Sequence, residues 1–169
     1  MDNLEQEFFS SEGHQRNLAA LAKHFPEDID DQTAILKCHL LSEQNLRDFC
    51  YVSVPNPNFL KDARLQFNHI SSLARALLTL PEDVDMSWIW GALKLLNDLR
   101  NRYAHELDPD QLAIDERIQK FKDLLSGIVD QEEVYRGLTL PLRTYLGLFV
   151  GALSTCLYCG VEFKKRQQS

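Results

Sequence analysis

The sequence predicts an all-α protein, an up-and-down bundle of about five to six helices. Apolar residues recur every three or four positions over long stretches, and no run of strict alternation between turn residues is present. Glycine and proline are scarce, at 7 and 6 of 169 residues, so few points interrupt these stretches. Amphipathic helices joined by short loops pack as a bundle. The length and the 44% hydrophobic content predict one domain over residues 1–169.

The first two helices are separated by a turn that contains proline and acidic residues. Residues 4–24 have the helical period, and Pro26 ends this segment, so residues 1–26 are predicted to form an N-terminal accessory helix. Asp30 or Asp31 can cap the next helix, because a short carboxylate side chain accepts a bond from free backbone N–H groups. That helix is predicted over residues 33–51.

The third and fourth helices have the clearest apolar stripes. The third is predicted over residues 59–80, and its stripe is Phe59, Ala63, Phe67, Ile70, Ala74 and Leu77. The fourth is predicted over residues 87–105, with Asp85 or Ser87 as its cap, and its stripe is Trp88, Ala92, Leu95, Leu96, Leu99 and Tyr103. Trp90 falls off this stripe and marks a candidate interface.

A fifth helix is predicted over residues 114–126, ending at Gly127, and a last one begins near Pro141. Residues 139–169 are therefore expected to form a C-terminal packing helix with a basic tail. Residues 144–161 lack charge, which is also typical of a membrane anchor. Their length is at the bottom of the spanning range and three glycines dilute them, which favours a buried bundle helix and no membrane contact.

Charge and cysteine content narrow the possible functions. The formal net charge of −7 argues against nucleic-acid binding by an overall basic surface, so any RNA contact must be local. The acidic N-terminus has no signal-peptide pattern, which predicts a cytoplasmic protein with reduced thiols. Cys156 and Cys159 have the spacing of a zinc or redox pair, but without a second pair buried core cysteines are favoured. We expect no metal site and no cofactor.

The segment Arg100-Asn101-Arg102-Tyr103-Ala104-His105 contains the residue types needed for phosphate chemistry. A guanidinium matches phosphate oxygens, and an imidazole can accept and donate protons near neutral pH. The structural alternative is that these cations cap the end of a helix. Arg102 can hold a flanking phosphate, or it can form an ordinary surface ion pair with Glu106, four residues on.

Helix geometry separates two of these side chains. At about 100 degrees per residue, Asn101 and His105 share a face, whereas Arg100 lies roughly 140 degrees from His105. Three arrangements bring them together: the helix ends before His105, the long Arg100 side chain bends round, or a second copy supplies the partner.

The run from Leu95 to Glu106 resembles the Arg, polar, His signature of the HEPN superfamily, with Asn101 as the polar residue. This resemblance implies a HEPN-like core over residues 30–127 and a metal-independent endoribonuclease of the toxin or phage-defence kind. It implies catalytic roles for Arg100, Asn101 and His105, with Arg102 as a substrate-binding residue. It also implies a homodimer whose two motifs form one cleft that binds RNA.

A longer stretch, roughly residues 33–163, resembles the mannitol-repressor branch of the same superfamily. The matching features are Phe59-Leu60-Lys61-Asp62, the helix that follows, the motif and the Ala113-Ile114-Asp115 step. Nuclease activity is not an established property of that branch. The alternative function is therefore a non-catalytic regulator that acts through protein contacts. No helix-turn-helix element is recognisable, so direct sequence-specific DNA binding is not expected, and a protein antitoxin or regulatory partner remains open.

Overall fold

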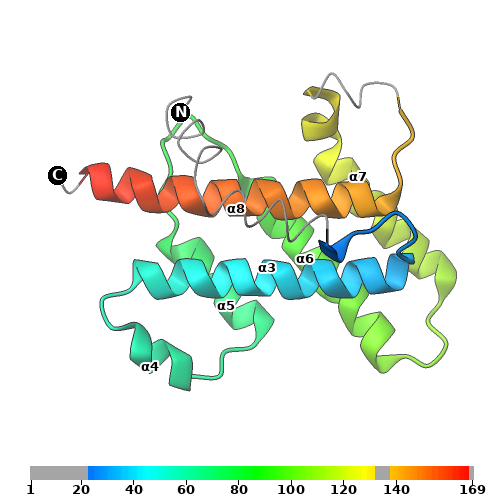
Figure 1. Cartoon of the computed structure of the whole chain (residues 1–169), viewed down its shortest axis with the longest axis horizontal. Helices are drawn as coiled ribbons and strands as arrows, with labels where there is room; N and C mark the ends of the chain where they lie inside the picture. Colours follow the sequence, from blue (N-terminus) through cyan, green and yellow to red (C-terminus); the bar gives the residue numbers. More distant parts are fainter. Residues whose placement is uncertain (1–22, 132–137, 168–169) are drawn as a thin grey trace.

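The structure, a computed structural model, describes residues 23–131 and 138–167, where all regular structure is helical (Figure 1). The prediction of an all-α bundle is confirmed. The helices in these residues are α3 (Asp31–Ser53), α4 (Pro57–Asp62), α5 (Phe67–Leu77), α6 (Ser87–His105), α7 (Gln111–Gln131) and α8 (Leu142–Gln167). The predicted helix over residues 4–24 lies outside the described part, except for Lys23 and His24, which are helical.

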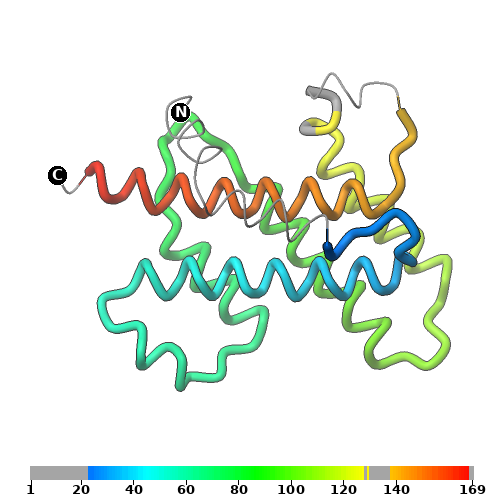
Figure 2. Tube along the Cα trace, in the orientation of Figure 1, coloured from blue at the N-terminus to red at the C-terminus, as the bar shows by residue number. Residues whose placement is uncertain are grey.

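Helix α3 is the centre of the bundle, because it packs against α8, α5 and α6. Its first turn is capped by Asp30, whose carboxylate accepts a bond of 2.8 Å from the Thr33 N–H. This bond lowers the pKa of Asp30. Helix α8 lies beside α3 along most of its length, and the two helices run in the same direction (Figure 2). The Cys38 thiol of α3 lies 3.8 Å from the Leu146 carbonyl of α8.

The predicted continuous helix over residues 59–80 is wrong, because the chain breaks between α4 and α5. Arg64 has a φ of 46°, in the left-handed region that a helix cannot contain. The Arg47 guanidinium of α3 donates a bond of 2.6 Å to the Leu65 carbonyl in this break. This tertiary bond satisfies a carbonyl that helical bonding would otherwise use. Phe59, expected in the core, is 80% exposed as a result of the new direction of α4.

Helix α6 has the bounds that the sequence predicts. The predicted cap at Asp85 or Ser87 is wrong, because Met86 occupies the N-cap position, although the Ser87 N–H donates to the Asp85 carboxylate at 2.8 Å. Of the predicted stripe, Ala92, Leu96 and Leu99 are buried, and the remaining three side chains are half-buried against the core. The buried face also contains a polar residue, Asn97, which the apolar pattern did not predict.

The other face of the bundle is closed by α7 and α8. Phe149 of α8 makes edge contacts with Phe121 of α7 and Trp88 of α6, at ring-centroid distances of 5.3 and 6.3 Å. All four cysteines are buried thiols, as predicted. Helix α8 is the one helix of the described residues that is long and apolar enough to cross a membrane by length and composition, with a mean hydropathy of 1.6. A buried core helix of a soluble protein passes the same test, and α8 packs on α3 and α7.

Helix α7 continues past Gly127, so the predicted end at this glycine is wrong. A Cβ atom added at Gly127 would have no neighbour within 4 Å, and the backbone there is not left-handed. We therefore expect Gly127→Ala to raise the free energy of unfolding by up to about 1 kcal/mol, since alanine is the better helix former. Urea denaturation measures this directly. A loss of stability would show instead that α7 ends at Gly127.

Candidate active site

One pocket gathers the three side chains that the motif singled out. Arg100, Asn101 and His105, in the last two turns of α6, line a single cavity of about 420 Å³. The other lining residues come from α3, from the start of α5 and from α6 itself, and they are His39, Glu43, Gln66, Phe67, Asn68 and Asn97. His105 is exposed at the end of α6, whereas Arg100 and Asn101 are half-buried. The cavity is thus open to solvent at the imidazole and deepens toward α3.

The structure resolves the angular mismatch between Arg100 and His105 within one chain. Helix α6 includes His105, so the helix does not end early. The Arg100 side chain bends toward its neighbour instead, and its Nη1 donates a bond of 3.0 Å to Asn101 Oδ1. The Asn101 side chain therefore orients the guanidinium, and its NH₂ group remains as a donor at the cavity. A second chain is not needed to bring these groups to one cavity.

Arg102 lies apart from this group. Its Nη1 lies 3.3 Å from the carboxylate of Glu106, one helical turn further on, and the two side chains form an ion pair. Arg102 is not among the residues that line the cavity. Both side chains of the pair are partly exposed, so water screens the attraction. The geometry fits the surface ion-pair interpretation of Arg102 better than a role in holding phosphate.

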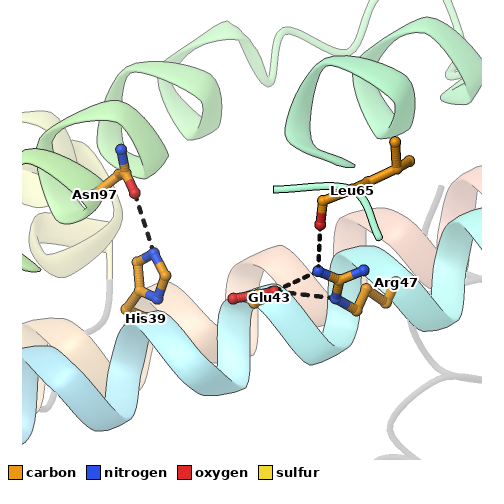
Figure 3. A network of polar contacts seen from close by, with 5 residues as sticks. All are labelled: His39, Glu43, Arg47, Leu65 and Asn97. Atoms are coloured by element: carbon orange, nitrogen blue, oxygen red, sulfur yellow. Dashed lines mark hydrogen bonds and ion pairs between the residues drawn. The ribbon is translucent and has the colours of Figure 1, made fainter. Parts of the chain in front are cut away.

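A chain of three hydrogen-bonded polar side chains lines the cavity, and two of them, His39 and Asn97, are buried while Asn68 is exposed. His39 of α3 is only 3% exposed, and its Nε2 lies 3.2 Å from Asn97 Oδ1 of α6 (Figure 3). The Asn97 NH₂ group in turn donates to Asn68 Oδ1 of α5 at 3.3 Å. Because the Asn97 oxygen can only accept, Nε2 of His39 must carry the proton. The chain therefore links three helices through one defined imidazole tautomer.

The His39 imidazole is held neutral by its surroundings. Burial lowers its pKa most, and the nearby Arg100 charge lowers it further, while the bond to Asn97 and the Glu43 carboxylate act in the opposite direction. The ring also stacks on Phe67 at a centroid distance of 4.1 Å. These contacts fix the ring in place, so His39 is suited to position the helices around the cavity.

The acidic side chain in the cavity lining is neutralised by a neighbour. Glu43 accepts bonds of 3.0 and 2.6 Å from Arg47, which also holds the Leu65 carbonyl (Figure 3). These contacts raise the pKa of Arg47. Because the Glu43 carboxylate is paired with Arg47, it does not balance the positive charge of the Arg100 guanidinium in the cavity lining. The cavity is therefore suited to an anionic group, although the whole protein is acidic.

Sequence reasoning missed His39, Asn97 and Asn68. A signal for Asn97 is present, because Asn97, Asn101 and His105 follow one another at intervals of four and form a polar stripe on one face of α6. His39 shares a face of its helix with Glu43 and Arg47, at intervals of four, but nothing in this spacing places it beside the motif. Only the crossing of α3 over α6 brings it to the motif.

Other chemistry-bearing residues are not gathered in this way. Within residues 23–131 and 138–167, no group of three or more His, Cys, Asp or Glu side chains is arranged to hold a metal ion. Burial raises the pKa of the Cys156 thiol to about 12, so it is protonated at neutral pH. Cys156 and Cys159 are buried on α8, as expected of core cysteines.

No family model, curated protein or solved structure matches this chain. Its function is therefore argued from the side chains of the cavity.

The lowered pKa of His39 makes a prediction about stability and pH. Below the ordinary histidine pKa of about 6.5, the unfolded chain binds a proton that the folded state rejects. The free energy of unfolding should therefore fall as the pH drops from 7 toward 5, until His39 is also protonated in the folded state. His39→Gln keeps a donor for Asn97 but cannot titrate, so it should flatten this part of the profile. Denaturation at several pH values provides the measurement.

The matched control is His69→Gln, at an exposed position of α5. This substitution should leave the slope as it is in the parent protein. Equal slopes for the parent and the His39 variant would mean that His39 does not govern acid stability.

Proposed function

We propose that the protein is a metal-independent endoribonuclease of the HEPN type, acting as a toxin or phage-defence effector in the cytoplasm. The observation that carries this proposal is the convergence of Arg100, Asn101 and His105 on one open cavity. A guanidinium, an amide donor and an accessible imidazole can together promote cleavage of a phosphodiester by the 2′-hydroxyl of the adjacent ribose. The resemblance of the motif to HEPN nucleases assigns the same three residues.

In the proposed reaction, His105 removes the proton of an RNA 2′-hydroxyl. The 2′-oxygen attacks the adjacent phosphorus, and the bond to the 5′-oxygen breaks, with the leaving oxygen taking a proton from solvent. Arg100 stabilises the added negative charge on the phosphoryl oxygens, and Asn101 orients Arg100 and donates to the phosphate. The products are a 2′,3′-cyclic phosphate and a 5′-hydroxyl.

The roles of these side chains predict the activity of variants. His105→Ala should lower the rate of RNA cleavage by about a hundredfold to ten-thousandfold, the usual loss when a general base is removed. Arg100→Ala should have an effect of similar size. Arg100→Lys should also be poor, because an ammonium lacks the planar fork. Cleavage of a labelled oligoribonucleotide in chelator measures each rate.

Arg102→Ala is the control, because Arg102 pairs with Glu106 outside the cavity lining. It should keep most of the activity, and all variants should retain the parent's helicity and melting temperature. Unfolding of the Arg100 and His105 variants would identify the motif as a structural cap. Full activity in folded variants would remove the catalytic assignment.

We further propose a homodimer in which the C-terminal ends of the two α6 helices lie near each other. Two large apolar side chains flank this end, since Leu107 is fully exposed and Leu112 is 69% exposed. A two-fold axis here would bury both and would bring two Arg100 charges together. Because one chain completes the cavity, the dimer would enlarge the binding surface and would not supply a missing group.

This arrangement predicts that Leu107→Asp shifts the protein toward a monomer in sedimentation equilibrium, because a charge replaces an apolar contact. Val52→Asp, at an exposed apolar position near the end of α3, is the matched control and should leave the mass unchanged. A parent protein that is monomeric at micromolar concentration would contradict the proposed dimer.

The second candidate function is a non-catalytic regulator of the mannitol-repressor kind. The same exposed leucines favour it, because a protein partner or antitoxin can cover them as well as a second copy can. In that case His105→Ala and Arg100→Ala would leave biological activity intact, whereas Leu107→Asp would abolish it.

A further inference from the structure

A second hollow continues the proposed active-site cavity along the groove between α5 and α6. It has a volume of about 350 Å³ and shares Phe67, Asn68 and Asn97 with the first cavity. Its other lining residues are Ser71, Ser72, Arg75, Trp90, Lys94 and Asp98. The two hollows therefore adjoin each other, and we call the pair the α5–α6 trough.

The trough is built by two facing stripes of side chains. On α6, positions 90, 94, 97, 101 and 105 follow one another at intervals of three or four, so they lie along one face. On α5, positions 68 and 72 are four apart, as are positions 71 and 75, so these four side chains also share a face. From Trp90 to His105 the α6 stripe extends roughly 22 Å, at about 1.5 Å per residue. That length accommodates several nucleotides of a single strand.

The charge of the trough is opposite in sign to that of the protein. Arg75, Lys94 and Arg100 line it, against two acidic residues. One of these, Glu43, forms an ion pair with Arg47 at 2.6 Å. The three cations of the lining therefore face one other acidic side chain, that of Asp98. In a chain of net charge −7, this strip of positive charge is a local site for a polyanion.

The far end of the trough adds an aromatic surface. The Arg75 guanidinium lies 6.0 Å from the centre of the half-buried Trp90 ring, in a cation–π contact. Guanidinium and indole planes are the surfaces on which unpaired bases stack. Trp90, which falls off the core stripe of α6, is thus packed partly against the core and partly lines the trough.

We propose that the α5–α6 trough binds the part of a single-stranded RNA that flanks the scissile phosphate. Arg75 and Lys94 hold backbone phosphates, and Trp90 with Arg75 offers a stacking surface for a base. This inference rests on the proposed ribonuclease site, which it extends from one phosphate to a strand. It predicts a preference for unpaired RNA, because stacking needs exposed bases.

Binding is best measured in the His105→Ala background, where RNA is not consumed. The probe is a fluorescent, unstructured oligoribonucleotide of about ten nucleotides, a length within the usual range of single-strand sites. Removing two phosphate contacts by Arg75→Ala with Lys94→Ala should lower the salt dependence of log K by about 1.4 and the affinity at 0.1 M salt by roughly 25-fold. Asp98→Asn should tighten binding, because a repulsive charge is removed.

Lys120→Ala is the matched control, since Lys120 is an exposed helical lysine on α7, outside the trough. Its affinity should equal that of the background protein. An Arg75 and Lys94 double variant that binds like the background, or a Lys120 variant that loses as much, would overturn the proposal. So would a failure of the background protein to bind RNA, as expected if a protein partner occupies the trough.

The two proposals can fail separately. If the parent cleaves RNA and the trough substitutions change neither cleavage nor affinity, the ribonuclease site stands and the trough does not bind the strand. If the trough substitutions weaken binding as expected but the parent cleaves nothing, the trough binds RNA and the catalytic proposal is wrong.

Discussion

A buried imidazole that must keep its hydrogen-bond partner constrains how three helices of this protein meet. His39 is nearly inaccessible to water, so losing the bond to Asn97 would leave polar groups unsatisfied in the interior, which typically costs about 1–3 kcal/mol. Asn97 is fixed in turn by Asn68. These two bonds fix the position of α3 relative to α6, and of α6 relative to the start of α5. The cavity that contains Arg100 and His105 lies over this junction.

The same junction explains how an acidic protein can present a local positive site. The carboxylate nearest the cavity, that of Glu43, is occupied by Arg47, which is itself held by the Leu65 carbonyl. This arrangement leaves the guanidinium of Arg100 to act on a ligand. The Leu65 carbonyl that Arg47 binds lies in the segment between α4 and α5, next to the start of α5 at the edge of the cavity. One arginine thus contributes both to the backbone path and to the electrostatics of the site.

The sequence was sufficient for the features that depend on local pattern. The bounds of α6 and the cap at Asp30 follow from apolar periodicity and short polar side chains. Local pattern failed where a distant contact decides the outcome. The break before α5 contains the Leu65 carbonyl, which Arg47 binds from eighteen residues away. The error at Gly127 is of another kind, because this glycine stays helical within a long α7 without a tertiary neighbour at its Cβ position. The motif residues were predictable from their spacing, whereas His39 joins them only through the crossing of α3 and α6.

If this cavity cleaves RNA by attack of the 2′-oxygen, as proposed, the chemistry of the product ends shows it most directly. Mass spectrometry of an oligoribonucleotide incubated with the protein in chelator should find 2′,3′-cyclic phosphate and 5′-hydroxyl ends. A substrate with a single 2′-deoxy substitution should resist cleavage at that position, and His105→Ala should yield neither product. Intact RNA with the folded parent protein, or products with 5′-phosphate ends, would contradict the account.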